Sequence, residues 1–122
     1  MIWDIVQEWM QCRAALLPAI AETKGTHTED DVLIELFTGR MKLWRKGHSG
    51  LVTEFCQFPR MKCINVFLAG GDLADVLALQ TDIENFGRVN GCRRATMLGV
   101  RDGWQRAVTG NQIAGTYMYK DL

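Results

Sequence analysis

The stretch from residue 61 to residue 106 constrains the fold of this chain more than any other part. It reads as a buried strand, a glycine turn, an amphipathic helix over 72–89, a glycine stop, a second strand and a short Trp-bearing helix. A helix-bearing connection of this length joins parallel strands of one sheet, so we expect 63–69 and 93–98 to be parallel. The sequence therefore predicts a β-α-β crossover at 63–98.

Two helices are predicted ahead of the strands. Apolar residues recur at three- and four-residue steps from Ile2 to about Ala21, the pattern of a helix with one buried face, which Pro18 should bend or break. Thr28 can cap a second helix whose first turn is acidic, and Gly39 is a natural residue just past its end.

A hairpin is predicted next. Two apolar runs, 51–58 and 61–69, flank the pair Pro59-Arg60, which suits a tight connection because proline presets the first turn angle. In a two-residue loop, residues whose numbers sum to 119 face each other, so Glu54 should oppose Asn65. Both faces of this hairpin are apolar, as expected of a central strand pair covered by helices on two sides.

Two alternating segments predict outer strands. In 40–45, Trp44 shares a solvated face with Lys42 and Lys46, so we expect it to be exposed unless another chain covers it. The segment 112–119 alternates again and is expected to close the chain as a final strand. The predicted class is α/β (α+β), with a central mixed β-sheet flanked by helices.

Composition excludes several function classes. The 122 residues predict one domain, 1–122, with an N-terminal helix in 1–25. Fourteen basic and fourteen acidic residues cancel, so we expect no specific nucleic-acid partner. The four cysteines form no CxxC pair and no cluster with histidine, which indicates no metal site and reduced thiols in a cytosolic compartment. No apolar run reaches about 18 residues and no signal peptide is recognisable, so membrane insertion is not expected.

The predicted order of elements is similar to the GNAT (Gcn5-related N-acetyltransferase) fold. The segment NGCRRATMLGVRDGWQRAV also resembles the second half of small GNAT-like proteins encoded by tailed bacteriophages and prophages. This resemblance covers about 29–122 and is most specific around 68–71 and 90–106. It implies a single GNAT-like domain.

The resemblance places an acetyl-CoA site at the start of the crossover. In a working GNAT, a Gln/Arg-x-x-Gly-x-Gly/Ala loop offers backbone N–H groups to the pyrophosphate at a helix N-terminus. Ala69, Gly70 and Gly71 occupy that place here, without the leading Gln or Arg and without the spaced glycines. Asp72, which we interpret as an N-cap, and Asp75 add negative charge where a phosphate would bind. We therefore expect no cofactor.

The same resemblance implies a general base and a general acid. Glu54, on a central strand, is placed where a base would lie, and Tyr117 or Tyr119 would have to supply the acid from the final strand. The helix that carries the acid in many GNAT enzymes has Trp104 here, and an indole is not a general acid. The catalytic residues therefore stay unknown, with these three as candidates.

A protein interface is the other candidate site. Trp and Arg are over-represented in binding hot spots, which singles out Trp44 and the basic residues Arg93, Arg94, Arg101 and Arg106. An arginine cluster usually forms salt bridges with its neighbours, and the alternative is a docking patch for an acidic surface.

From the resemblance we expect a catalytically degenerate, structural or accessory virion component near the portal, the head-to-tail junction or the internal core. Its partners would be other phage structural proteins or further copies of itself, in the host cytoplasm during infection and then in the virion. The alternative is an active acetyl-CoA-dependent N-acetyltransferase acting on a small amine or a protein. A third option is a factor that binds a bacterial host protein.

Overall fold

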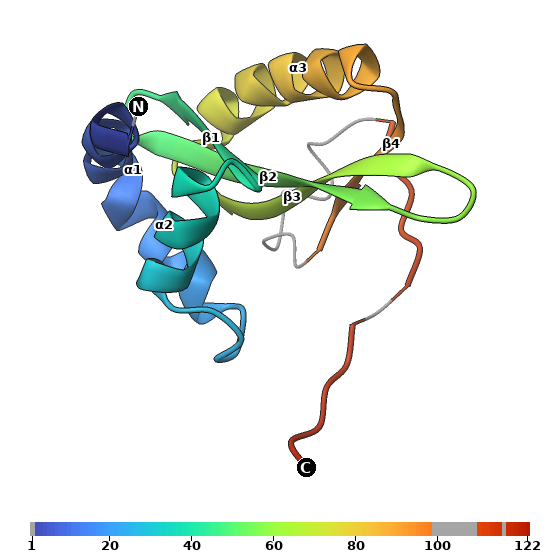
Figure 1. Ribbon diagram of the computed structural model, residues 1–122, viewed down its shortest axis with the longest axis horizontal. Coiled ribbons are helices and arrows are strands. Elements are labelled where there is room, and N and C mark those ends of the chain that lie inside the picture. Colours follow the sequence, from blue (N-terminus) through green and yellow to red (C-terminus); the bar gives the residue numbers. More distant parts are fainter. Residues whose placement is uncertain (1, 99–109, 116) are drawn as a thin grey trace.

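The computed structural model describes residues 2–98, 110–115 and 117–122 (Figure 1). In these residues the sheet has four strands in the order β1-β2-β3-β4, the first three antiparallel and the last parallel to β3. The elements are α1 (Ile2–Ala21), α2 (Glu29–Phe37), β1 (Met41–Lys46), β2 (Ser49–Gln57), β3 (Lys62–Gly70), α3 (Leu73–Val89) and β4 (Cys92–Met97). The predicted mixed sheet flanked by helices is confirmed for the described residues.

The crossover is also confirmed. α3 connects β3 to β4, and Asn65 lies opposite Thr96 in the parallel ladder. The glycine that stops the helix, Gly91, has a φ of 81°, a conformation that glycine adopts without strain.

The predicted hairpin register holds over most of the hairpin. Glu54 pairs with Asn65, and Thr53 pairs with Val66, as the sum of 119 requires. Beyond Thr53 the register shifts by one residue, because a bulge places Val52 opposite Leu68. The simple sum rule is therefore wrong at the end of β3 that leads into the crossover.

Helices cover both faces of the sheet, as predicted. α1 and α2 lie on one face and α3 lies on the other (Figure 1). The residues buried under α1 and α2 are Trp9, Cys12, Leu16, Ile20, Val32, Leu36, Met41, Val52 and Leu68. Those buried under α3 are Leu51, Ile64, Val66, Val76, Leu79 and Ile83. Each face of the sheet thus has its own apolar core.

The two N-terminal helices begin and end largely as their sequences predict. Thr28 and Asp31 form a reciprocal capping box at the start of α2, and Gly39 follows its end with a φ of 80°. Pro18 does not break α1, which continues to Ala21, although a proline at this position cannot donate to the carbonyl four residues earlier.

α1 crosses the sheet on two glycines that face each other. Gly50 of β2 pairs with Gly70 of β3, and α1 lies directly over both. A Cβ on Gly50 would lie 2.9 Å from the Cys12 Sγ, and one on Gly70 would overlap the backbone carbonyl of Ala15. The helix can therefore approach the sheet this closely only because neither position has a side chain.

The predicted final strand is wrong for its described residues. Residues 112–115 and 117–119 lie in no strand, and the end of the chain leads away from the sheet (Figure 1). The side chains of Ile113, Tyr117 and Tyr119 are exposed by 79%, 64% and 58%. An alternating pattern specifies a strand only if a partner edge is within hydrogen-bonding reach, and this segment has no such partner among the described residues.

We predict that Gly70→Ala destabilises the protein by about 3 kcal/mol, because the new methyl group must displace the α1 backbone rather than a side chain. Gly115→Ala is the matched control, since nothing lies within 4 Å of that position, and its effect should stay within about 0.5 kcal/mol. Urea unfolding of the two variants and the parent measures both values. Equal stabilities of the two variants would show that α1 does not pack directly against Gly70.

Candidate functional site

The turn that leads into α3 is packed on both sides. The three residues that sequence reasoning assigned to cofactor binding lie here: Ala69 and Gly70 end β3, and Gly71 begins the turn. Gly70 lies against α1, and Gly71, with a φ of 107°, lies so close to Ser49 that a Cβ would overlap the serine hydroxyl. Both glycines therefore serve close packing within the protein.

The side chain of Ser49, the first residue of β2, lies at the N-terminus of α3. It is 2% exposed, and its Oγ accepts a hydrogen bond of 2.9 Å from the Asp72 backbone N–H. The same hydroxyl donates to Asp75 Oδ2, also at 2.9 Å. Asp72 has the predicted N-cap position, but its side chain makes no capping bond. Sequence reasoning missed Ser49 because it lies in a segment that reads only as a turn.

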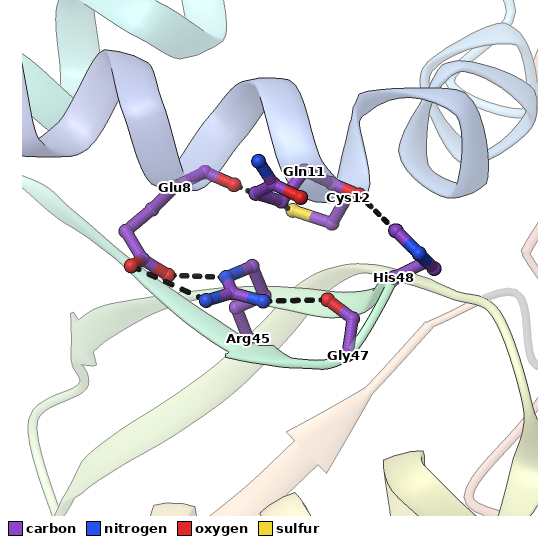
Figure 2. Close-up of polar contacts among 6 residues, drawn as sticks. All are labelled: Glu8, Gln11, Cys12, Arg45, Gly47 and His48. Atoms are coloured by element: carbon purple, nitrogen blue, oxygen red, sulfur yellow. Dashed lines mark hydrogen bonds and ion pairs between the residues drawn. The ribbon is translucent and has the colours of Figure 1, made fainter.

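Contacts with α1 hold the tip of the β1–β2 hairpin in place (Figure 2). Ser49 is the first residue of β2 after this tip. Arg45 forms an ion pair with Glu8 of α1, and its Nη1 donates to the Gly47 carbonyl at 2.7 Å. The His48 Nδ1 lies 3.1 Å from the Gln11 carbonyl oxygen. The hydrogen bond from Arg45 lowers the pKa of Glu8, so the carboxylate stays charged at neutral pH.

Cys12 lies in the same network as a buried thiol. Its Sγ is 3.5 Å from the Glu8 carbonyl oxygen, as in a hydrogen bond that follows the helix axis. Burial raises its pKa to about 11, which keeps the thiol protonated at neutral pH and unreactive as a nucleophile. Cys12 therefore belongs to the packing between α1 and Gly50 rather than to chemistry.

Glu54 belongs to a polar ladder that crosses three strands. Its Oε2 accepts from Asn65 Nδ2 at 3.1 Å, and Asn65 Oδ1 accepts from Thr96 Oγ1 at 2.9 Å. Tyr117 and Tyr119 lie on the exposed end of the chain that leads away from the sheet (Figure 1). The structure thus brings Glu54 together with Asn65 and Thr96 and not with the tyrosines. Trp104 is outside the described residues.

Trp44 is not exposed as expected, because α3 covers its face of the sheet. The indole packs edge-on against Phe86 of α3, with ring centroids 5.4 Å apart, and its Nε1 donates to the buried Thr53 hydroxyl at 2.9 Å. Lys42 Nζ lies over the indole, 4.9 Å from its centroid, in a cation–π contact. The Nζ of Lys42, one of the two lysines that suggested a solvated face, also lies 5.3 Å from the centroid of Phe86 in α3.

The arginine candidates are only partly described. Arg93 and Arg94 are exposed on β4 and line a hollow of about 300 Å³ between β4 and α3. Arg101 and Arg106 lie outside the described residues, so their proximity to Arg93 stays a prediction. No group of three or more potential metal ligands occurs in residues 2–98, 110–115 and 117–122. Over the same ranges, no helix has the length and apolar character needed to cross a membrane.

Comparisons with known proteins add no family to this geometry. No family model matches the chain, and neither the curated proteins nor the solved structures include a significant match. The GNAT resemblance therefore rests on the residues quoted above and on the order of the elements.

We predict that Trp44→Ala lowers the free energy of unfolding by about 3 kcal/mol, because it removes the ring between β1 and α3. Trp44→Phe keeps one aromatic ring but loses the bond to Thr53 and part of the volume of the indole, so it should cost less, about 2 kcal/mol. Chemical denaturation of both variants tests this order. An unchanged stability in Trp44→Ala, together with weakened binding to another chain, would restore Trp44 as an exposed interface residue.

Proposed function

We propose that this chain is a GNAT-like protein of phage or prophage origin that has no acetyltransferase activity and acts by binding other proteins, as a structural or accessory component of the virion. Two kinds of observation support the proposal. The described elements come in the order that the resemblance predicts up to the strand after the crossover: two helices, three antiparallel strands, a helix and a parallel strand. The segment over 90–108 resembles the second half of small phage GNAT-like proteins.

The single observation that carries the proposal is the filled turn before α3. An acetyl-CoA pyrophosphate needs free backbone N–H groups at a helix N-terminus and open space beside them. The Asp72 N–H is bonded to Ser49, and the Ser49 side chain occupies the space beside Gly71. Asp75 adds a carboxylate 2.9 Å from the same hydroxyl. These groups favour a turn that stabilises the fold over one that binds an anion.

The alternative, an active N-acetyltransferase, has less support. It requires a base and an acid on either side of a bound thioester. Glu54 is engaged by Asn65 in a ladder within the sheet, and the candidate acids Tyr117 and Tyr119 lie on an exposed segment outside it. A protein-binding role does not require Glu54 and a tyrosine to lie together.

The virion location and the phage partners come from the resemblance alone. A component of the portal, the head-to-tail junction or the internal core binds neighbouring phage proteins or further copies of itself. The exposed side chains Phe55, Phe58 and Leu98 and the paired charges Arg93 and Arg94 are surface groups that such contacts would use.

We predict that acetyl-CoA titrated into about 100 µM protein gives no binding heat by calorimetry. The double variant Asp72→Ala, Asp75→Ala should also bind no acetyl-CoA, because Ser49 and α1 still fill the turn when the two carboxylates are gone. A low-micromolar dissociation constant for the parent, about −8 kcal/mol, would refute this proposal and favour the enzyme. Binding by the double variant alone would show that charge, rather than packing, closes the site.

We also predict that the protein is recovered in purified phage particles. The readout is mass spectrometry of particles produced with the gene intact and with the gene deleted, because a structural component is retained through particle purification whereas a cytoplasmic factor is washed away. If the intact particles lack the protein and assembly proceeds normally without it, the virion assignment is wrong.

A further inference from the structure

Two cysteines lie directly opposite each other in the β2–β3 hairpin. Cys56 of β2 pairs with Cys63 of β3, and both are free thiols. The facing pair two residues further along, Glu54 with Asn65, points to the same side of the sheet, because side chains alternate along a strand. There the two side chains are joined by a hydrogen bond of 3.1 Å. Side chains on this side of the sheet therefore reach across from β2 to β3.

The spacing of the two strands at this pair suits a disulfide. At the hairpin turn the Phe58 N–H donates to the Met61 carbonyl at 2.8 Å, so these two residues form a hydrogen-bonded pair. Hydrogen-bonded and non-hydrogen-bonded pairs alternate along an antiparallel ladder, which makes Cys56 and Cys63 a hydrogen-bonded pair as well. The Cα atoms of such a pair are about 5.5 Å apart, within the range of about 4.4–6.8 Å that disulfides span.

Neither of the other two cysteines competes for Cys63. The chain has four cysteines, and the structure describes all of them. Cys12 lies against Gly50, at the opposite end of β2 from Cys56. Cys92 packs in the core under α3 together with Ile64, and the Ile64 side chain points to the opposite side of the sheet from its neighbour Cys63. Cys56 is therefore the thiol that faces Cys63.

The two thiols differ in their access to solvent. Cys56 is partly exposed, whereas Cys63 is only 2% exposed. A small reagent therefore reaches Cys56 first, and Cys63 reacts second, with a group already attached to its neighbour.

We propose that Cys56 and Cys63 form a reversible disulfide by exchange with a small-molecule disulfide, for which oxidised glutathione is the probe. The Cys56 thiolate attacks one sulfur of the reagent, forms a mixed disulfide and releases one glutathione thiolate. The Cys63 thiolate then attacks the Cys56 sulfur and releases the second glutathione thiolate. Two protein thiols are oxidised, one reagent disulfide is reduced, and the two protons lost by the cysteines end on the two glutathione thiols.

The environment of the pair makes this exchange slow and reversible. Burial raises the pKa of Cys56, and the neighbouring Glu54 and Cys63 raise it further, so little thiolate is present at neutral pH. The Cβ atoms of a facing pair, about 5.5 Å apart, must approach to about 3.8 Å in a disulfide, and such strain makes the bond easier to reduce. The exchange requires no protein partner, so it is independent of the role proposed above.

The test uses the folded full chain in mixtures of reduced and oxidised glutathione at about pH 8, where thiolate attack is faster than at neutral pH. After an acid quench, mass spectrometry of the intact protein distinguishes an internal disulfide, which loses two hydrogens, from an added glutathione. Peptide mapping then identifies the linked cysteines. Cys63→Ala removes the second thiol, and Cys92→Ala is the matched control on the opposite side of the sheet.

We expect the parent to form the link between Cys56 and Cys63 and to lose it in excess reduced glutathione. Cys63→Ala should stop at a glutathione adduct on Cys56, whereas Cys92→Ala should form the link to within about twofold of the parent. A parent that carries only adducts, a link that includes Cys92, or a link that persists in excess reduced glutathione would overturn the proposal. If Cys63→Ala does not fold, the peptide map of the parent decides alone.

Discussion

The contact between α1 and the facing glycines of β2 and β3 is the constraint on which the rest of the structure depends. Gly50 and Gly70 pair with each other and have no side chains, so Cys12 and Ala15 of α1 lie directly against the backbone of the sheet. This contact sets the distance between the helix and the sheet, so it determines how the core under α1 is filled. It also brings α1 close enough to Arg45 and His48 to fix the hairpin tip that carries Ser49.

The same contact explains why a glycine pair before a helix does not by itself indicate a phosphate site. Glycines permit close approach of any group, whether a pyrophosphate or a neighbouring helix. Here the neighbours are Ala15 on one side and Ser49 on the other, and the first amide of the turn is already bonded to Ser49. The chemistry of the turn is therefore decided by residues more than twenty positions away in the sequence.

Local patterns are sufficient to predict the crossover, the Thr28 cap and the pairing of Glu54 with Asn65, because each depends on a continuous sequence pattern or on a short turn. They are insufficient where the outcome depends on distant groups. The alternation predicts an exposed Trp44, because Lys42 and Lys46 share its side of the strand, whereas α3 covers the indole. Ser49 carried no signal, since its partners Asp72 and Asp75 lie on another element. The segment 112–119 alternates like a strand, yet its described residues form none. An alternating pattern does not show whether a partner strand is within reach.

The central claim is that Ser49 and α1 occupy the N-terminus of α3 in place of a ligand. Hydrogen exchange of the Asp72 amide measures this most directly, because that N–H donates to the buried Ser49 hydroxyl. The account predicts that this amide exchanges as slowly as the amides of β2 and β3, that Ser49→Ala accelerates it, and that added acetyl-CoA leaves it unchanged. An Asp72 amide that exchanges rapidly in the free protein and becomes protected when acetyl-CoA is added would contradict the account.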